Sequence, residues 1–385
     1  MIAVIADDFT GAAEIGGIAL RHGFRVVVDT KVGKTTDTDV LVIATDTRSL
    51  MPGQAAQTAR QTTSDLLAIN PCFIYKKVDS LLRGNVAEEL LAQLSVSGKS
   101  RALTVPANPD LGRTIRDGVY YFDGVPLSEL GFHESRGDGH SSSLVTDLLG
   151  KSAAGRAGVI SAGDEFPDKE LIVGNVSDSE DLGRWVGRID SQTIPAGGSG
   201  FFEAILKSRK GTPDYKGNEI KLGRKALYVC GSAFEGSRSL VRTSGKEGLA
   251  VIYMPERLFC EKENTGRLMR KWTDEIAEAI KTREKVVIAV GSLDCDDIED
   301  LSLMIRQALA EAVEGVLRAI AVDELMIEGG ATSFSVIRKL GYTRFYPVQE
   351  LGPGVVRMKI EGKDDMHLTL KPGSYAWPAF VWNYR

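Results

Sequence analysis

The sequence predicts an α/β fold with two α/β domains, each with a mainly parallel sheet flanked by helices, and with a ligand cleft between them. Short apolar runs alternate with helix-like segments along most of the chain, which is typical of parallel sheets covered by helices. The length of 385 residues exceeds what one hydrophobic core usually supports. The polar, aperiodic residues 207–225 are typical of a linker, so we expect an N-terminal domain at 1–210 and a C-terminal domain at 211–385.

The N-terminal domain begins with an apolar run at residues 2–6, and residues 12–23 have helical spacing that ends at a glycine. The same alternation continues along the domain. We expect further strands at 25–30, 39–47, 72–80, 102–106, 158–161 and 170–175, and helices at 54–69 and 86–95. Sheets of this kind bind ligands at the carboxyl ends of their strands, so the polar residues at those ends are the candidates for a site.

The C-terminal domain repeats the pattern after residue 225. Its last forty residues are rich in glycine, proline and short strand-like pieces, which favours a small antiparallel region over 346–385. We expect strands at 226–232, 286–292 and 324–330, and helices at 296–317 and 331–341.

Composition excludes several classes of protein. A formal net charge of -5 gives no overall attraction to nucleic acid or to an anionic membrane. The four cysteines, Cys72, Cys230, Cys260 and Cys295, lie far apart without metal-ligand spacing, which is typical of reduced thiols in a cytosolic protein. The N-terminus enters a strand without a signal-peptide pattern, and no apolar stretch reaches 18 residues. We therefore expect a cytoplasmic protein.

The segment VGKTT at residues 32–36 imitates the end of a phosphate-binding P-loop. A P-loop needs a glycine five residues before its Gly-Lys pair, so that backbone amides surround a phosphate. Val28 occupies that position, inside a β-branched strand. An exposed basic loop is the better interpretation.

Two adjacent carboxylates, Asp7 and Asp8, follow the first strand. Buried carboxylates repel each other and are costly to desolvate unless cations, hydroxyls or helix amides meet them. We expect one of them to accept hydrogen bonds from sugar hydroxyls or to balance Lys and Arg. The other aspartate could instead cap the helix that follows.

A denser polar segment, KKVDSLLRGN, follows the strand expected at 72–80. Arginine and lysine suit a carboxylate substrate, whereas aspartate and asparagine accept hydrogen bonds from polyol hydroxyls. The alternative is a solvated helix start, with Asp79 or Ser80 as N-cap and Arg83 paired to a glutamate. The candidates in this segment are Lys77, Asp79, Ser80, Arg83 and Asn85.

A similar segment, DTRS at residues 46–49, contains Arg48 at another strand end. Alone it is better explained as a turn with an exposed arginine. Together with Asp7, Asp8 and the KKVDSLLRGN segment, it places acids and bases at three strand ends of one sheet. This combination predicts a site for a small polyhydroxylated acid.

In the second half, glycines end several strands, in CGSAF at 230–234, VGS at 290–292 and EGGATS at 328–333. Such turns free backbone amides and point a helix N-terminus at phosphate oxygens, although glycine turns between strand and helix are also routine. Further glycine turns occur in LGPGVV and LKPGSYAWP, and Lys371 could reach a phosphate. The alternative for Lys371 is an exposed lysine before a Pro-Gly turn.

The motifs ADDFTGA, DTRS, KKVDSLLRGN, GGATS and LKPGS, in this order, resemble those of the four-carbon acid sugar kinase family. The resemblance implies an N-terminal domain that binds a four-carbon sugar acid, such as threonate, erythronate or 3-oxo-tetronate. It also implies a C-terminal domain that binds ATP, a requirement for Mg²⁺, and a 4-phosphate product. Metal ligands are not identified, and a homodimer remains open as an oligomeric state.

The resemblance, taken with the strand-end reasoning, assigns residues to two groups. Asp8, Lys77 and Asp79 are the expected catalytic residues. Substrate binding is expected from Asp7, Asp8, Arg48, Lys77, Asp79, Ser80, Arg83 and Asn85. Nucleotide binding is expected from Ser232, Ser292, Gly329, Gly330, Ala331, Thr332, Gly354, Lys371 and Gly373.

Two other functions were weighed. A dinucleotide-dependent dehydrogenase would need G-x-G-x-x-G after a strand and an acidic residue about 20 positions later, and no strand here is followed by that pattern. A non-catalytic sugar-acid sensor would use the same binding residues without transferring a phosphoryl group.

Overall fold

The computed structural model describes residues 1–33, 37–130, 142–210, 220–232, 234–260, 265–291 and 300–383. Contacts divide the chain into two compact units, Met1–Tyr215 and Lys216–Arg385, called unit 1 and unit 2 below. The division falls within 211–219, outside the described residues, so the boundary after residue 210 stays a prediction. The ligand cleft between the domains also stays a prediction.

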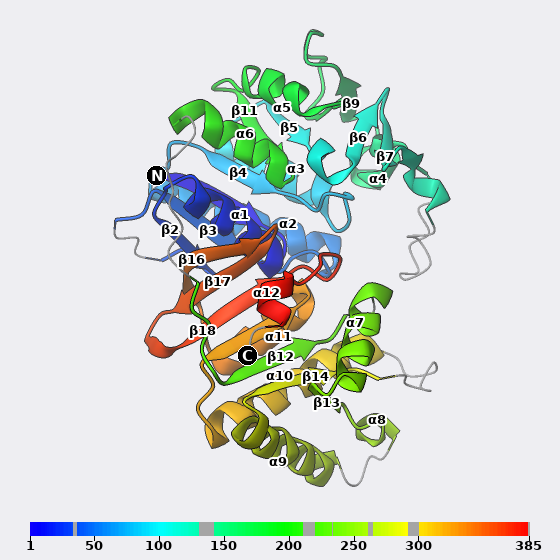
Figure 1. The fold of residues 1–385 in the computed structure, drawn as a ribbon. Helices are drawn as coiled ribbons and strands as arrows, with labels where there is room; N and C mark the ends of the chain where they lie inside the picture. Colours follow the sequence, from blue (N-terminus) through cyan, green and yellow to red (C-terminus); the bar gives the residue numbers. More distant parts are fainter. Residues whose placement is uncertain are drawn as a thin grey trace. The chain divides into compact units, whose positions relative to one another are not determined.

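Unit 1 is built on a parallel sheet whose described strands have the order β2-β3-β1-β4-β11-β5-β10-β9 (Figure 1). Its strands are β1 (Ile2–Ala6), β2 (Val26–Asp29), β3 (Val40–Ala44), β4 (Ile74–Lys77), β5 (Arg101–Val105), β9 (Ala157–Ile160), β10 (Leu171–Gly174) and β11 (Thr193–Gly197). In β1, Ala6 pairs with Ala44 of β3 and with Lys77 of β4. This register brings the carboxyl ends of three strands to one edge of the sheet.

The helices of unit 1 pack on this sheet in two groups, α1 with α5 and α6, and α2 with α3. They are α1 (Phe9–Arg21), α2 (Pro52–Ala68), α3 (Val86–Ser97), α4 (Val145–Leu148), α5 (Ser179–Val186) and α6 (Ser199–Lys210). A separate antiparallel sheet follows β5 and contains β6 (Arg113–Arg116), β7 (Val119–Phe122) and β8 (Val125–Pro126). Because α6 continues to Lys210, the start of the predicted linker at 207 is wrong.

Unit 2 has a mixed sheet with the order β13-β14-β12-β15-β18-β17-β16 among its described strands. β16, β17 and β18 pair in antiparallel fashion, which confirms the antiparallel region expected at the C-terminal end. The strands are β12 (Ala226–Cys230), β13 (Ala250–Tyr253), β14 (Lys285–Ala289), β15 (Glu324–Glu328), β16 (Arg344–Gly352), β17 (Val355–Ile360) and β18 (Lys363–Lys371).

Helices also flank this second sheet (Figure 1). They are α7 (Glu235–Lys246), α8 (Arg257–Cys260), α9 (Thr265–Arg283), α10 (Leu301–Ala319), α11 (Gly330–Leu340) and α12 (Ala379–Trp382). The mixed α/β fold with mainly parallel sheets and flanking helices is therefore confirmed. None of the described helices combines the length and apolar character that crossing a membrane requires.

An aromatic cluster holds the end of the chain against the core of unit 2. The ring of Tyr228 in β12 lies 5.5 Å from that of Trp377 and 5.1 Å from that of Trp382, centroid to centroid. The Tyr228 hydroxyl donates a hydrogen bond of 2.6 Å to the carbonyl of Val381. These contacts fix the segment that follows Lys371, which includes Gly373, one of the predicted nucleotide-side residues.

Candidate functional site

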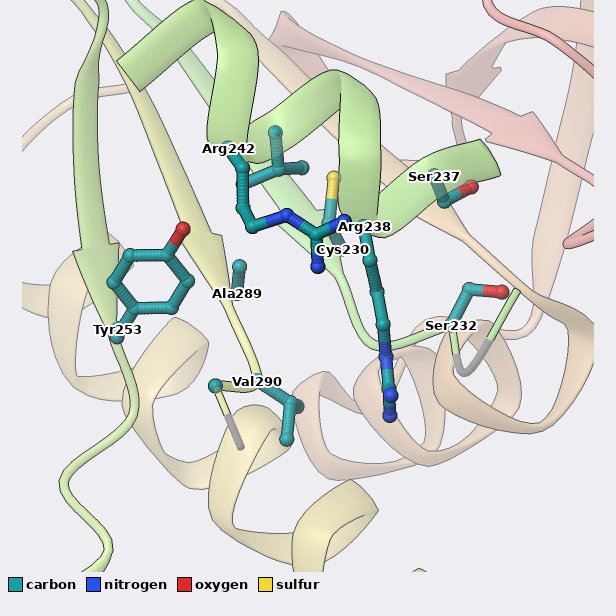
Figure 2. A pocket seen from close by; sticks show the side chains of 10 residues that line it. Cys230, Ser232, Ser237, Arg238, Arg242, Tyr253, Ala289 and Val290 are labelled. Atoms are coloured by element: carbon teal, nitrogen blue, oxygen red, sulfur yellow. The ribbon is translucent and has the colours of Figure 1, made fainter. Parts of the chain in front are cut away.

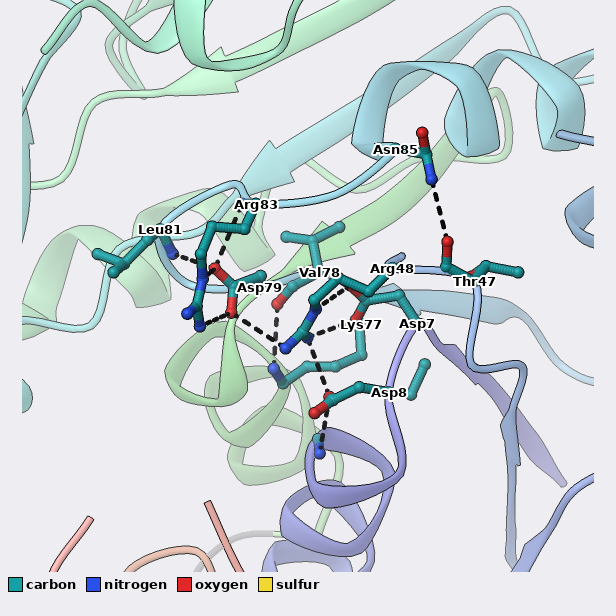
Figure 3. Close-up of polar contacts among 12 residues, drawn as sticks. Asp7, Asp8, Thr47, Arg48, Lys77, Val78, Asp79, Leu81, Arg83 and Asn85 are labelled. Atoms are coloured by element: carbon teal, nitrogen blue, oxygen red, sulfur yellow. Dashed lines mark hydrogen bonds and ion pairs between the residues drawn. The ribbon is translucent and has the colours of Figure 1, made fainter. Parts of the chain in front are cut away.

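The carboxyl edge of the unit 1 sheet brings together the charged residues predicted from three strand ends. Figure 3 shows Asp7, Asp8, Arg48, Lys77 and Asp79 pointing toward one another. Strand β3 ends at Ala44 rather than at the predicted residue 47, so Arg48 lies on the loop after it. The side chains converge because β1, β3 and β4 are parallel neighbours whose ends are aligned by register.

Asp8 is the N-cap of α1. Its carboxylate accepts hydrogen bonds from the backbone N–H of Gly11 at 2.9 Å and from the hydroxyl of Thr10 at 2.6 Å. A Cβ atom at Gly11 would lie 2.5 Å from Asp8 Oδ1, so glycine is needed there. The geometry supports the capping alternative for one of the two aspartates, and it fixes the orientation of Asp8 at the edge of the site.

Arg48 is the centre of the cluster. Its Nε and Nη2 atoms donate to the two oxygens of Asp7 at 2.7 and 2.9 Å, and Nη2 also donates to Asp8 at 2.9 Å. Its Nη1 lies 3.5 Å from Asp79 Oδ1. Gly84, with φ of +90°, packs against it, because a Cβ there would lie 2.9 Å from Arg48 Cγ. The alternative of an exposed arginine in a turn is wrong, since the Arg48 side chain is only 17% exposed.

Burial and charge oppose each other at these carboxylates. Burial alone would raise the pKa of Asp7, but the charge of Arg48 and its hydrogen bonds outweigh burial and lower it. Burial is likewise outweighed at Asp79, where Arg83 and Arg48 hold the pKa well below its ordinary value. Both carboxylates are therefore ionised at neutral pH.

Arg83 forms a two-pronged pair with Asp79. Its Nε and Nη2 atoms donate to the Asp79 oxygens at 2.7 and 2.6 Å. Asp79 also accepts the backbone N–H of Leu81 at 3.1 Å, in a turn where Leu82 has φ of +56°. The helix-start alternative is wrong, because α3 begins only at Val86. The expected pairing of Arg83 with a glutamate is also wrong, because its partner is Asp79.

Lys77 and Lys76 point to opposite faces of β4, as successive strand residues do. Lys76 forms a buried ion pair with Glu89 at 2.5 Å. Lys77 faces the cluster, where Nζ donates to the carbonyl of Val78 at 3.0 Å and lies 3.7 Å from Glu14. An ammonium group has three N–H donors, so Lys77 keeps donor capacity in a nearly buried position.

Ser80 and Asn85 have structural contacts in this cluster. The carbonyl of Ser80 accepts a hydrogen bond of 2.5 Å from the hydroxyl of Tyr120 in β7. The amide of Asn85 donates to the carbonyl of Thr47 at 3.0 Å (Figure 3). It also donates to the carbonyl of Leu50 at 3.0 Å. Asn85 therefore holds the loop that carries Arg48, and the direct substrate contacts expected of Ser80 and Asn85 stay predictions.

The nucleotide-side residues of unit 2 gather in the same way. Cys230 pairs in register with Ala289 and Glu328, and Glu328 pairs with Lys371. The glycine turns that follow these strands therefore share one edge of the sheet. A Cβ at Gly373 would lie 3.2 Å from the Ser232 hydroxyl, and one at Gly231 would lie 2.8 Å from the Thr332 hydroxyl. Ser232, Thr332 and Gly373 are thus brought together, whereas Ser292 lies outside the described residues.

Gly329 and Gly330 begin helix α11 at this edge. Gly329 is the N-cap with φ of +91°, and no side chain caps the helix. The free N–H groups of this first turn are suited to bind an anion. Ala331 is exposed and Thr332 is buried in the same turn.

Lys371 and Gly354 support the neighbouring turn. The Lys371 side chain is fully buried, which makes the exposed-lysine alternative wrong. Its ammonium donates to the carbonyls of Pro372 at 2.9 Å and Tyr375 at 2.5 Å, and lies 3.4 Å from Glu328. Burial lowers the pKa of Lys371. Gly354, with φ of +67°, lies against the Tyr375 ring. A phosphate contact by Lys371 stays a prediction.

A cavity of about 320 Å³ adjoins Ser232 in unit 2. Figure 2 shows Arg238 and Arg242 of α7, together with Tyr253 at the end of β13, around it. The sequence reasoning missed these three residues, although the two arginines are four positions apart, as residues on one helix face are. The lining consists of Cys230, Ser232, Ser237, Arg238, Val241, Arg242, Tyr253, Ala289, Val290 and Gly291.

Known proteins match both halves of the chain. A family model described as a sugar-binding N-terminal domain matches residues 2–204, and one described as a nucleotide-binding C-terminal domain matches residues 227–375. Two solved structures share the fold. A Salmonella typhimurium protein described as a putative tRNA synthase has a TM-score of 0.77 at 20% identity, covering 99% of this chain and 98% of its own. A Haemophilus influenzae protein has a TM-score of 0.69 at 21% identity, covering 97% of both chains.

Curated relatives are kinases of four-carbon acids. A 3-oxo-tetronate kinase from Methylobacterium radiotolerans is 24% identical, over 98% of this chain and 96% of the relative. A D-threonate kinase from Salmonella typhimurium is 36% identical, over 38% of this chain and 35% of the relative. A D-erythronate kinase from Heliobacterium modesticaldum is 25% identical, over 50% and 45% of the two chains. The first family model alone matches more than half of the chain, and the chain belongs to the four-carbon acid sugar kinase family.

Proposed function

We propose that the protein is an ATP-dependent kinase that phosphorylates the terminal C4 hydroxyl of a four-carbon sugar acid, such as threonate, erythronate or 3-oxo-tetronate, in the cytoplasm. The observation that carries the proposal is the cluster of buried acids and bases at the carboxyl edge of unit 1. The names of the relatives support the reaction and the class of acid.

Phosphoryl transfer needs positioning and neutralisation of phosphate charge more than a covalent step. Lys77 suits the second task, because its ammonium is nearly buried and retains donors. Asp8 suits the first, since it accepts three hydrogen bonds and a carboxylate offers about four lone-pair positions, which leaves one for a sugar hydroxyl. Asp79 already accepts four hydrogen bonds, from Leu81 and Arg83, and orients Arg83 beside the site. Arg48 holds these two carboxylates in place.

For the nucleotide, the free amides at the start of α11 and the hydroxyl of Ser232 suit phosphate oxygens. The adjoining cavity, with Tyr253 on one side and Ala289 and Val290 beneath, suits the base and ribose. This arrangement supports the assignment of Ser232, Gly329, Gly330 and Gly373 to the nucleotide.

Mg²⁺ fits as a companion of the triphosphate. Among the described residues, no group of three or more His, Cys, Asp or Glu side chains could hold a metal ion. Mg²⁺ commonly keeps several waters and binds substrate phosphates with one or two carboxylates. The protein therefore does not need to supply a complete set of metal ligands. When bound, it would neutralise phosphate charge.

The test is ADP release by the purified full chain with ATP, MgCl₂ and a panel of four-carbon acids, with the product identified by mass spectrometry and ³¹P NMR. We expect turnover with at least one acid and a 4-phosphate product. A matched Lys77→Met variant should lose turnover while retaining its melting temperature within a few degrees. Acid-dependent thermal stabilisation without any ADP release would reject the kinase and favour a sugar-acid sensor.

A further inference from the structure

Arg113 in β6 is a buried arginine without a charged partner. The residue is 9% exposed, and its Nε atom has no hydrogen-bond partner. Within the described ranges, its guanidinium forms no ion pair, although it lies 5.8 Å from the centre of the Phe122 ring. Burying an unpaired charge costs several kcal/mol, so an anion that enters the site would find in Arg113 an unoccupied partner.

The other arginines near the predicted site are already engaged. Arg48 directs its planar fork at Asp7, and Arg83 directs its fork at Asp79. A substrate carboxylate could use the Nε–Nη2 edge of either residue only by displacing a protein carboxylate.

The formal charges of the cluster also indicate that an anionic substrate needs a cation outside it. An anionic substrate adds one more negative charge and therefore needs a further cation. The described cluster has four carboxylates against three cations, namely Asp7, Asp8, Glu14 and Asp79 against Arg48, Lys77 and Arg83.

Backbone pairing places Arg113 at the edge where Lys77 lies. Lys77 of β4 pairs with Gly197 of β11, and Gly197 pairs with Val105 of β5. The chain after Val105 returns through Asn108, which exchanges two backbone hydrogen bonds of 3.0 Å with Arg113. With neighbouring strands about 4.8 Å apart, β4 and β5 are separated by roughly 10 Å, a distance that two long side chains can span.

The hairpin presents Arg113 on the face that contacts the predicted site. Arg113 pairs with Phe122, and Ile115 pairs with Tyr120. Residues two apart on a strand share a face, so Arg113 and Tyr120 lie on the same face. Because the hydroxyl of Tyr120 donates to the carbonyl of Ser80, this face is the one directed at the segment from Lys77 to Asn85.

We propose that Arg113 binds the carboxylate of the sugar acid through a two-pronged ion pair and thereby selects acids over uncharged four-carbon polyols. The inference rests on the proposed function and names the residue that recognises the acid group. It assigns this role to a residue outside the substrate-binding candidates of the sequence, among which Arg48 and Arg83 pair with protein carboxylates. A planar guanidinium matches a carboxylate in geometry, and lysine does not.

The experiment compares Arg113→Gln and Arg113→Lys with Arg116→Gln. Arg116 is a matched control on the same strand, because it is exposed, faces the opposite side and lies 5.9 Å from the Tyr121 ring. We expect Arg113→Gln to raise the KM for the acid about 10- to 100-fold, the effect of losing one charge-assisted pair, with the KM for ATP unchanged. Arg113→Lys should recover part of the loss, and Arg116→Gln should match the wild type.

Calorimetric titration of the acid without ATP separates this proposal from the kinase proposal. Loss of acid binding in Arg113→Gln, with the melting temperature of the ligand-free protein kept or raised, supports the assignment even if no acid is phosphorylated. An unchanged KM and affinity for the acid in both Arg113 variants would overturn it, while turnover by the wild type would still support the kinase. A lowered melting temperature with both KM values raised equally would also overturn it, because it indicates a structural role.

Discussion

At the scale of single residues, the predicted substrate site is a network in which each charge depends on another. Arg48 contacts Asp7, Asp8 and Asp79. Burial opposes the charged form of Arg48, but the three carboxylates outweigh it and raise its pKa well above the ordinary value. Arg48, Asp7 and Asp79 are therefore charged together, and removing one of them leaves a buried charge of the opposite sign.

Arg48→Met tests this interdependence. Removing one partner of a buried ion pair typically costs about 3 to 5 kcal/mol, so we expect a loss of that size in the free energy of unfolding, measured by urea denaturation. Arg25→Met is the control, because Arg25 is 56% exposed and pairs with Asp39 at 3.0 Å. It should cost about 1 kcal/mol or less. Similar small losses in both variants would show that the network around Arg48 is not stabilising.

At the scale of secondary-structure elements, the sequence predicted best the strands that are continuous apolar runs, such as β1, β3, β12 and β15. It missed β11, which contains Pro195, and α7, which has two glycines and mostly polar residues. In these elements tertiary packing decides the structure, and local propensity does not.

The hairpin of β6 and β7 was also missed, although its signal is in the sequence. Asp117-Gly118 and Asp123-Gly124 both have positive φ at each residue, and Asp-Gly between short β-prone runs is a strong hairpin signal. Missing the hairpin hid Arg113, because that residue comes close to the site through this separate sheet and not through a strand end of the main one.

The sequence predicted which residues form the candidate site better than it predicted which of them pair with each other. The residues at the ends of β1, β3 and β4 converge because parallel strands share an edge, which the sequence pattern indicates. Which arginine pairs with which carboxylate depends on turn geometry, such as the positive φ of Leu82 that folds Arg83 back on Asp79. That detail cannot be read from the order of residues.

Helix α11 offers a prediction at the element scale, because it has a glycine with positive φ at each end. Gly329 is its N-cap with φ of +91°, and Gly341 is its C-cap with φ of +71°. A Cβ at either position would meet no atom within 4 Å, so Gly→Ala acts on the backbone alone and costs about 1 to 3 kcal/mol.

We expect Gly329→Ala to raise the KM for ATP at least several-fold, because strain there turns the first amides of α11 away from the phosphates. Gly341→Ala should lower the melting temperature by a similar amount and leave both KM values unchanged. Steady-state kinetics, with the concentrations of ATP and of the acid varied separately, measure the two KM values in both variants. Equal changes of the ATP KM in both variants would remove Gly329 from the nucleotide site.

At the scale of the whole molecule, the two units differ in how their buried carboxylates respond to acid. In unit 1, the pKa of Asp79 is held well below 3.8, because Arg83 and Arg48 outweigh burial. In unit 2, burial raises the pKa of Glu324 above 4.5, and its contacts with Arg357 and Gly223 do not fully offset it. In unit 1, burial also raises the pKa of Glu89, and the charge of Lys76 offsets this effect only in part.

The signs of these shifts predict how each unit responds to acid. A lowered folded pKa gives stability that is present above the unfolded value and is lost as the pH falls through the folded value. A raised carboxyl pKa works in the opposite direction, since the folded state then takes up the proton first. Asp7 and Asp79 therefore make unit 1 lose stability as the pH falls below about 5, against the opposing effect of Glu89. In unit 2, Glu324 opposes such a loss, but burial lowers the pKa of His367 to about 4, so His367 removes stability as the pH falls from its ordinary value of 6.5. The two units thus respond to acid through different groups and over different pH ranges.

Hydrogen exchange of the full chain between pH 6 and pH 3, corrected for the pH dependence of intrinsic exchange, measures this difference. We expect peptides from β1, β3 and β4 to lose protection as the pH falls below about 5. Asp79→Asn should make the protection of unit 1 less dependent on pH, because the variant lacks the titrating carboxylate with the largest downward shift. If Asp79→Asn leaves the pH dependence of unit 1 unchanged, the buried network around Arg48 is not the source of its response to acid.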